Sequence, residues 1–107
     1  MSRYNIIALI KIEENVETPK TGGIKSGYAP HHRFKGVDYL VSGFHEYSDN
    51  FIHYPGEIIS ARITFPSWEY FKNSVNVGDR FEILEMNRLI GCGLVEVIEE
   101  DENFSGT

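Results

Sequence analysis

Apolar side chains at every second position dominate this chain and predict β-strands. They recur in this way at residues 4–13 and 57–65, which is the spacing of a strand with one face toward a core. In the first segment the alternate positions are also apolar, so we expect burial on much of both faces. Shorter or less regular segments of the same kind are residues 26–34, 37–44, 80–85 and 89–98. The pattern therefore predicts about six strands.

Polar and turn-forming segments separate these strands. Residues 14–23 and 45–56 have loop chemistry, and the second segment ends in the turn pair Pro55-Gly56. Residues 66–77 break the alternation, and we expect one helical turn at residues 67–72 behind a Ser67 cap. Several strands with short turns and little helix are typical of an antiparallel barrel or sandwich.

Length and composition are consistent with one globular domain. The chain has 107 residues, 41% of them hydrophobic, which is enough for a single core. Seven Phe, six Tyr and one Trp supply bulky side chains for the interior of a small barrel. We expect one folded domain over residues 1–98, a barrel or a sandwich, and an acidic, frayed tail over residues 99–107.

The charge balance narrows the classes of partner. The net charge is −6, and the run 99–102 is entirely acidic. Phosphate backbones repel such a surface, so general nucleic-acid binding is disfavoured, although a local basic patch at residues 20–35 stays open as an RNA surface. The apolar run 6–10 is too short for a signal peptide or a membrane span. With one cysteine and no internal disulfide, the expected location is the cytoplasm.

Candidate catalytic and metal-binding patterns are weak. The four histidines, His31, His32, His45 and His53, do not have the spacing of a metal site. Cys92 between two glycines is typical of packing rather than of a nucleophile, and scattered carboxylates define no pair. There is no phosphate-binding loop of the Gly-Lys-Ser/Thr kind. We therefore expect no enzyme activity, no nucleotide, no metal and no cofactor.

One aromatic group is the best candidate for a binding surface. Trp68, Tyr70 and Phe71 lie in the segment that interrupts the strand pattern. Trp and Tyr are common at binding hot spots, but the same side chains could equally plug one end of a barrel. The sequence leaves both interpretations open, and one residue of the three could do each job.

Five short motifs in order suggest a family. They are Gly27-Tyr28-Ala29-Pro30-His31, Gly43, Pro55-Gly56-Glu57, Gly78-Asp79-Arg80-Phe81-Glu82-Ile83 and Gly91-Cys92-Gly93. In this order and at nearly this spacing, the chain resembles the third β-barrel domain of elongation factor Tu, standing alone. The resemblance spans residues 4–98 and implies a six-stranded antiparallel β-barrel, an all-β fold.

The resemblance also implies a set of RNA contacts. In the family this barrel touches the T-stem of aminoacyl-tRNA and packs against a GTPase domain. The positions here that correspond to RNA-facing residues are Lys20, Thr21, His31 and Arg88. The chain departs from the family where Ala29 replaces the motif Arg and His31 replaces the motif Gln. The connection at residues 66–78 is also longer than in the family.

These departures favour a non-enzymatic module that binds a protein. Such a module resembles the factor's barrel and would act as a mimic or an immunity-like decoy, binding something that normally recognises the factor. The alternative is a translation-associated factor that contacts tRNA or a translation GTPase. In both cases we expect no membrane partner. The first interpretation places the partner-binding candidates at Trp68, Tyr70 and Phe71.

Overall fold

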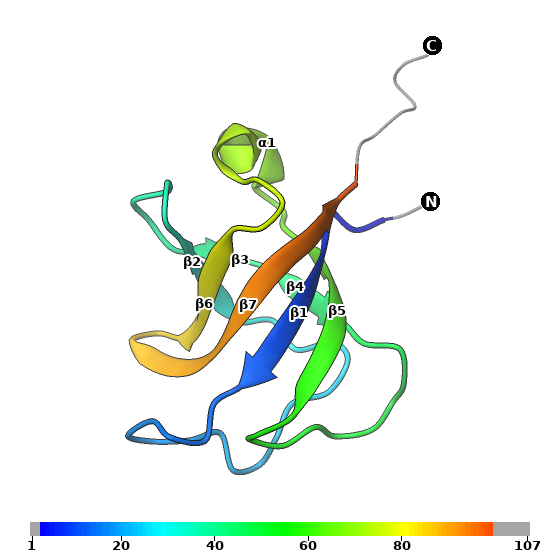
Figure 1. The fold of residues 1–107 in the computed structure, drawn as a ribbon, viewed down its shortest axis with the longest axis vertical. Coiled ribbons are helices and arrows are strands. Elements are labelled where there is room, and N and C mark those ends of the chain that lie inside the picture. The colour runs from blue at the N-terminus through cyan, green and yellow to red at the C-terminus, as the bar shows by residue number, and fades with distance from the viewer. Residues whose placement is uncertain (1–2, 100–107) are drawn as a thin grey trace.

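The fold is a mostly-β, nearly closed antiparallel barrel (Figure 1). A computed structural model describes residues 3–99, so the predicted tail lies outside the described residues except for Glu99. The strands are β1 (Ile6–Ile12), β2 (His31–Phe34), β3 (Val41–Ser42), β4 (Phe44–Glu46), β5 (Ile58–Thr64), β6 (Arg80–Glu85) and β7 (Arg88–Ile98). A short helix α1 (Trp68–Phe71) continues into a 3-10 turn η1 (Lys72–Ser74).

All strands belong to one antiparallel sheet in the order β3-β2-β6-β7-β1-β5-β4. The two outermost strands, β3 and β4, are consecutive in the chain and are separated only by Gly43. The ends of the sheet therefore meet at this residue, and the sheet curls into a barrel. Seven strands are present instead of the expected six because the third predicted strand, at residues 37–44, divides here into β3 and β4.

The closure requires a glycine at position 43, because the neighbouring rings leave no room for a side chain. A Cβ at this position would lie 2.8 Å from the His32 ring and 2.9 Å from the Phe65 ring. The Gly43 N–H donates to the Pro30 carbonyl at 3.1 Å, and the His45 N–H donates to the Tyr28 carbonyl at 2.8 Å. Backbone pairing thus continues from β3 into β4, which shields what would otherwise be open sheet edges.

Three predicted boundaries and one predicted burial pattern are wrong. The strand expected at 26–34 begins only at His31. The strand expected at 37–44 begins only at Val41, and the loop expected at 45–56 starts after Glu46, because β4 pairs with β5 and extends past Phe44. The first strand is buried on one face only: Ile6, Ala8, Ile10 and Ile12 are buried, but Leu9 is exposed. The sheet wraps a single core, so its outer face meets solvent.

Other predicted faces are confirmed. Ala61 and Ile63 on β5 are buried, and so is Phe65 directly after it. Phe81 and Ile83 are buried on β6. Alternation predicts these correctly because each strand has one inward face.

Helix α1 covers one end of the barrel, opposite the end where the loop after β1 lies (Figure 1). The helical turn is confirmed, but Ser67 makes no side-chain capping bond. What holds the helix is instead its aromatic face, because Trp68 stacks on Phe65 with ring centroids 5.8 Å apart, and Phe71 meets Phe34 at 5.8 Å. No helix described between residues 3 and 99 is long and apolar enough to cross a membrane.

Candidate functional site

The predicted aromatic group divides between the core and the surface. Trp68 is 8% exposed and Phe71 is 3% exposed, so both belong to the hydrophobic core, where α1 closes the barrel. Tyr70 is 84% exposed and points away from that core. Of the three candidates, Tyr70 alone presents its ring to solvent.

The structure brings two of the predicted RNA-contact residues to one carboxylate. The Lys20 ammonium lies 2.8 Å from Glu85, and the Arg88 guanidinium lies 3.5 Å from the same carboxylate. Arg88 also donates to the carbonyls of Thr18 and Pro19 at 2.9 Å each, and the Tyr28 hydroxyl donates to Glu85 at 2.6 Å. Both cations therefore make contacts within the protein, and these contacts connect the loop after β1 to the β6–β7 turn.

The remaining RNA candidates are Thr21 and His31. Thr21 is exposed beside Lys20, and His31 is half-buried on β2 opposite Leu84 of β6. Burial raises the pKa of the Glu85 carboxyl, but hydrogen bonds from Lys20 and Tyr28 outweigh it, and the pKa lies below its ordinary value. Glu85 is therefore ionised at neutral pH and offsets one of the two positive charges.

A more distinctive surface lies on the connection between β4 and β5. We call residues 47–57 the 47–57 loop. It exposes Phe51, Ile52 and Tyr54, and the adjoining first residue of β5, Ile58, is also exposed. Phe51 is 71% exposed. Single exposed apolar residues are ordinary, but several on one connection are typical of an interaction site.

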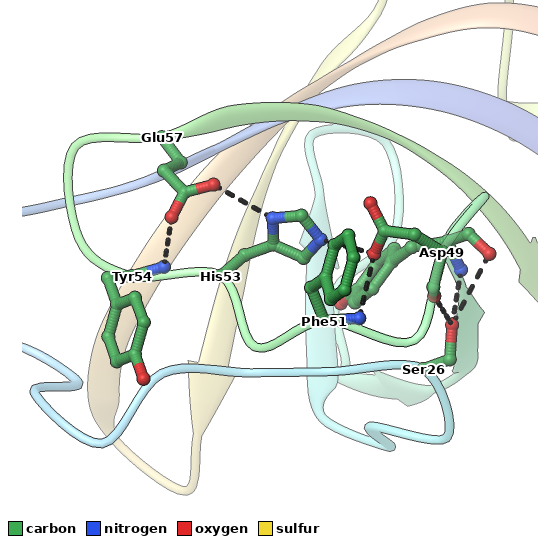
Figure 2. Close-up of polar contacts among 7 residues, drawn as sticks. Ser26, Asp49, Phe51, His53, Tyr54 and Glu57 are labelled. Atoms are coloured by element: carbon green, nitrogen blue, oxygen red, sulfur yellow. Dashed lines mark hydrogen bonds and ion pairs between the residues drawn. The ribbon is translucent and has the colours of Figure 1, made fainter.

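The 47–57 loop is held in shape by a charged clamp at its centre. His53 is buried, and its ring lies between two carboxylates: Nε2 is 2.8 Å from Asp49 and Nδ1 is 2.8 Å from Glu57 (Figure 2). The same carboxylates accept backbone bonds, from the Phe51 N–H to Asp49 at 3.0 Å and from the Tyr54 N–H to Glu57 at 2.8 Å. The exposed aromatic residues therefore flank a fixed imidazole.

A neighbouring segment supports the clamp from the other side. Ile24 and His53 form an isolated antiparallel bridge, with both backbone bonds at 2.8 Å. The Ser26 hydroxyl accepts the Tyr47 N–H at 2.8 Å at the start of the loop. A connection with this many bonds loses less conformational entropy on binding than a free loop, which favours recognition.

The electrostatics of the clamp favour the charged imidazole. Hydrogen bonds to Glu57 and then to Asp49 raise the pKa of His53 above its ordinary 6.5. In return, the bond from His53 and then the bond from the Phe51 N–H lower the pKa of Asp49. Glu57 behaves in the same way, with bonds from His53 and the Tyr54 N–H lowering its pKa.

A second chain of polar groups runs from the loop into the barrel. The Tyr47 hydroxyl lies 2.8 Å from His45 Nδ1, His45 Nε2 lies 2.8 Å from His32 Nε2, and His32 Nδ1 lies 3.1 Å from the Val41 carbonyl. Both imidazoles are buried. A carbonyl only accepts, so His32 Nδ1 carries the hydrogen, His45 donates to His32, and Tyr47 donates to His45.

With both imidazoles neutral, every ring nitrogen in this arrangement has a hydrogen-bond partner. Burial lowers the pKa of His32 to about 4. Burial and then the neighbouring His32 lower the pKa of His45 well below its ordinary 6.5. The pKa values of His32 and His45 are lowered whereas the pKa of His53 is raised, because, of these three imidazoles, only that of His53 is bonded to carboxylates within residues 3–99. Removal from water penalises a charge that no opposite charge compensates.

We expect the free energy of unfolding to fall as the pH drops from about 6.5 to about 4. In this pH window His32 and His45 bind protons in the unfolded chain but stay neutral in the folded protein. Each histidine therefore lowers the free energy of unfolding by about 1.4 kcal/mol per pH unit. His53 adds no slope here, because a group with a raised folded pKa contributes fully below its unfolded pKa. Urea unfolding at a series of pH values measures the slope, and a level profile would contradict the neutral buried pair.

Metal binding and thiol chemistry find little support in this geometry. Between residues 3 and 99, no group of three or more His, Cys, Asp or Glu side chains could hold a metal ion. The Cys92 thiol lies 3.4 Å from Glu13, and burial followed by this contact raises the pKa of the thiol. The reactive thiolate is therefore disfavoured.

The sequence prediction placed the candidate surface at Trp68, Tyr70 and Phe71, of which the structure exposes only Tyr70, and it did not include the 47–57 loop. Residues 45–56 were predicted as a loop, and the stretch Phe51-Ile52-His53-Tyr54 within them was a usable signal, since several apolar residues in one loop need an explanation. The acidic residues four positions either side of His53, Asp49 and Glu57, were a further signal. In comparisons with known proteins, no family model and no curated protein matches this chain.

Proposed function

We propose that this protein is a non-enzymatic binding module that recognises another protein through the 47–57 loop. The observation that carries the proposal is the exposure of Phe51, Ile52 and Tyr54 on a loop fixed by the His53 clamp. Aromatic anchors on a pre-organised support give affinity at low entropic cost. Tyr70, exposed on α1, is a second contact candidate from the sequence.

Charge supports a protein partner over an RNA partner. The net charge of −6 opposes a phosphate backbone. The cations that an RNA stem would need, Lys20 and Arg88, are engaged by Glu85 and by backbone carbonyls. Arg33 is likewise paired, with Glu82 at 2.9 Å.

The resemblance to the third domain of elongation factor Tu is the basis for a more specific proposal. The family motifs supply residues that a small barrel uses for closure, such as Gly43 between β3 and β4. A barrel of this shape would act as a mimic, occupying a protein that normally recognises the factor. The alternative is a translation-associated factor that contacts tRNA or a translation GTPase through the corner around Lys20 and Arg88.

Replacing Phe51 by alanine is expected to abolish capture of the partner while leaving the barrel folded. The side chain is 71% exposed, so its loss changes stability by less than about 0.5 kcal/mol. A central aromatic anchor, in contrast, is worth roughly 2 kcal/mol or more of binding energy, about 30-fold in affinity. Quantitative mass spectrometry after pulldown from the host's lysate compares the wild type, Phe51→Ala and a matched surface control, Val77→Ala.

Three outcomes separate the candidate functions. A protein captured by the wild type and by Val77→Ala but not by Phe51→Ala supports the proposal. Equal capture by all three contradicts the role of the 47–57 loop. Co-purifying tRNA that is lost at high salt and in a Lys20→Ala, Arg88→Ala double variant would favour the RNA alternative, because phosphate contacts are salt-dependent.

A further inference from the structure

Three of the four histidines are connected along the root of the 47–57 loop. Tyr47 is the joining residue: its hydroxyl lies 2.8 Å from His45, and its ring meets the His53 ring edge-on with centroids 5.8 Å apart. His45 in turn bonds to His32 in the barrel interior. A surface clamp and a buried imidazole pair therefore hold the same stretch of chain.

The groups that face these rings differ in charge. His53 faces the carboxylates of Asp49 and Glu57, the Tyr47 ring and the backbone of Ile24. The buried pair faces the phenol and phenyl rings of Tyr28, Tyr47, Phe65 and Phe81. His31 is adjacent to His32 in the chain. Within residues 3–99, no carboxylate is paired with either buried imidazole.

The clamp requires a protonated His53. Two carboxylates accept from its two ring nitrogens, and only the imidazolium donates from both. When the proton leaves, one nitrogen presents a lone pair to a carboxylate, and that contact becomes repulsive. The N–H groups of Phe51 and Tyr54 are bound to the same two carboxylates, so the exposed aromatic residues lose their support together.

The buried pair requires the opposite state. A proton added to His45 Nδ1 reverses its bond with the Tyr47 hydroxyl, and the resulting charge is buried without a carboxylate beside it. Protonation of both rings would place two N–H donors face to face across the 2.8 Å contact between His32 and His45. His45 lies on β4, which has three residues and continues directly into the loop, so a strained His32–His45 contact acts on the start of the loop.

We propose that protons control the 47–57 loop: it is held for binding while His53 is charged and the His32–His45 pair is neutral, and it loosens on either side of that pH window. This inference rests on the proposed function for its biological use. The order of the loop itself is measurable on the protein without any partner, so the two proposals fail separately.

The test is an NMR titration of the full chain labelled with nitrogen-15. Ring-nitrogen spectra report the protonation and tautomer of each histidine, and amide exchange, corrected for its intrinsic pH dependence, reports the order of Phe51 and Tyr54. We expect loss of protection at both amides with the same midpoint as the His53 proton on the alkaline side. On the acid side we expect a second loss that coincides with protonation of the buried pair.

Two glutamine variants make the test specific. In His53→Gln the side chain cannot carry a charge, so the alkaline transition at Phe51 and Tyr54 should disappear and both amides should resemble the wild type at high pH. His31→Gln, the matched histidine outside the loop, should keep both transitions. The amide of Ile10 in the barrel should stay protected throughout the alkaline transition in all three proteins.

Several results would overturn the proposal. It fails if His53 is neutral where the loop is ordered, if the loop amides ignore its titration, or if His32 and His45 titrate like exposed histidines. Partner capture measured at the same pH values separates the two hypotheses. If capture through Phe51 does not change when the loop loses its order, the proposal of proton control is wrong. The proposed binding function is then still supported.

Discussion

Replacement of Gly91 by alanine is expected to destabilise the barrel by roughly 3 kcal/mol or more. A Cβ at this position would overlap the Lys11 carbonyl oxygen on β1, which is a backbone atom and cannot rotate away. Strand β1 is itself held on both sides, by β5 and by β7. Thermal or urea unfolding of Gly91→Ala against the wild type measures the loss.

Gly22→Ala is the matched control for this substitution. Nothing lies within 4 Å of a Cβ at Gly22, and the residue is exposed in the loop after β1. The change should alter stability by about 0.5 kcal/mol or less. Equal unfolding midpoints for the two variants would show that β7 does not approach β1 as closely as described.

Trp68→Ala is expected to cost about 3–5 kcal/mol of stability, because a large buried side chain leaves a cavity. Trp68 stacks on Phe65 at 5.8 Å and meets the Phe71 ring edge-on at 5.3 Å, with 8% of its surface exposed. Its removal opens the end of the barrel that α1 covers. Urea unfolding gives the free energy, and near-ultraviolet circular dichroism reports aromatic packing.

Tyr70→Ala supplies the comparison two residues away. With 84% of its surface exposed, Tyr70 should contribute less than about 0.5 kcal/mol to folding. If Trp68→Ala were as stable as Tyr70→Ala, the tryptophan would belong to a surface. Its role as a partner-binding residue would then regain support over its role in closing the barrel.

Much of the barrel can be predicted from alternation alone. Strand β6 was predicted with its observed bounds, and β5 and β7 to within a few residues, because one inward face per strand gives a period of two. Alternation failed around Gly43, where one predicted strand becomes β3 and β4. Whether a strand bends to pair with two partners depends on where those partners lie, and local sequence does not encode that.

The candidate surface was less accessible to sequence reasoning. An aromatic side chain on a loop and one that closes a barrel have the same composition signal, so Trp68 and Phe51 were not distinguishable in kind. Burial separates them, at 8% and 71% exposed. Similarly, Lys20 and Arg88 were predicted as RNA contacts, but Glu85 lies distant from Lys20 in the chain and its proximity became visible only in the fold.

The histidines show the same division most clearly. The sequence by itself determined that β-strands dominate this chain, that His31 and His32 face opposite sides of a strand, and that the net charge disfavours phosphate. Only the tertiary structure decided that His32 meets His45 inside the barrel while His53 meets two carboxylates at the surface. Alternation and charge are local or additive properties of a chain, whereas the protonation state of an imidazole depends on which distant groups the fold brings to its two nitrogens.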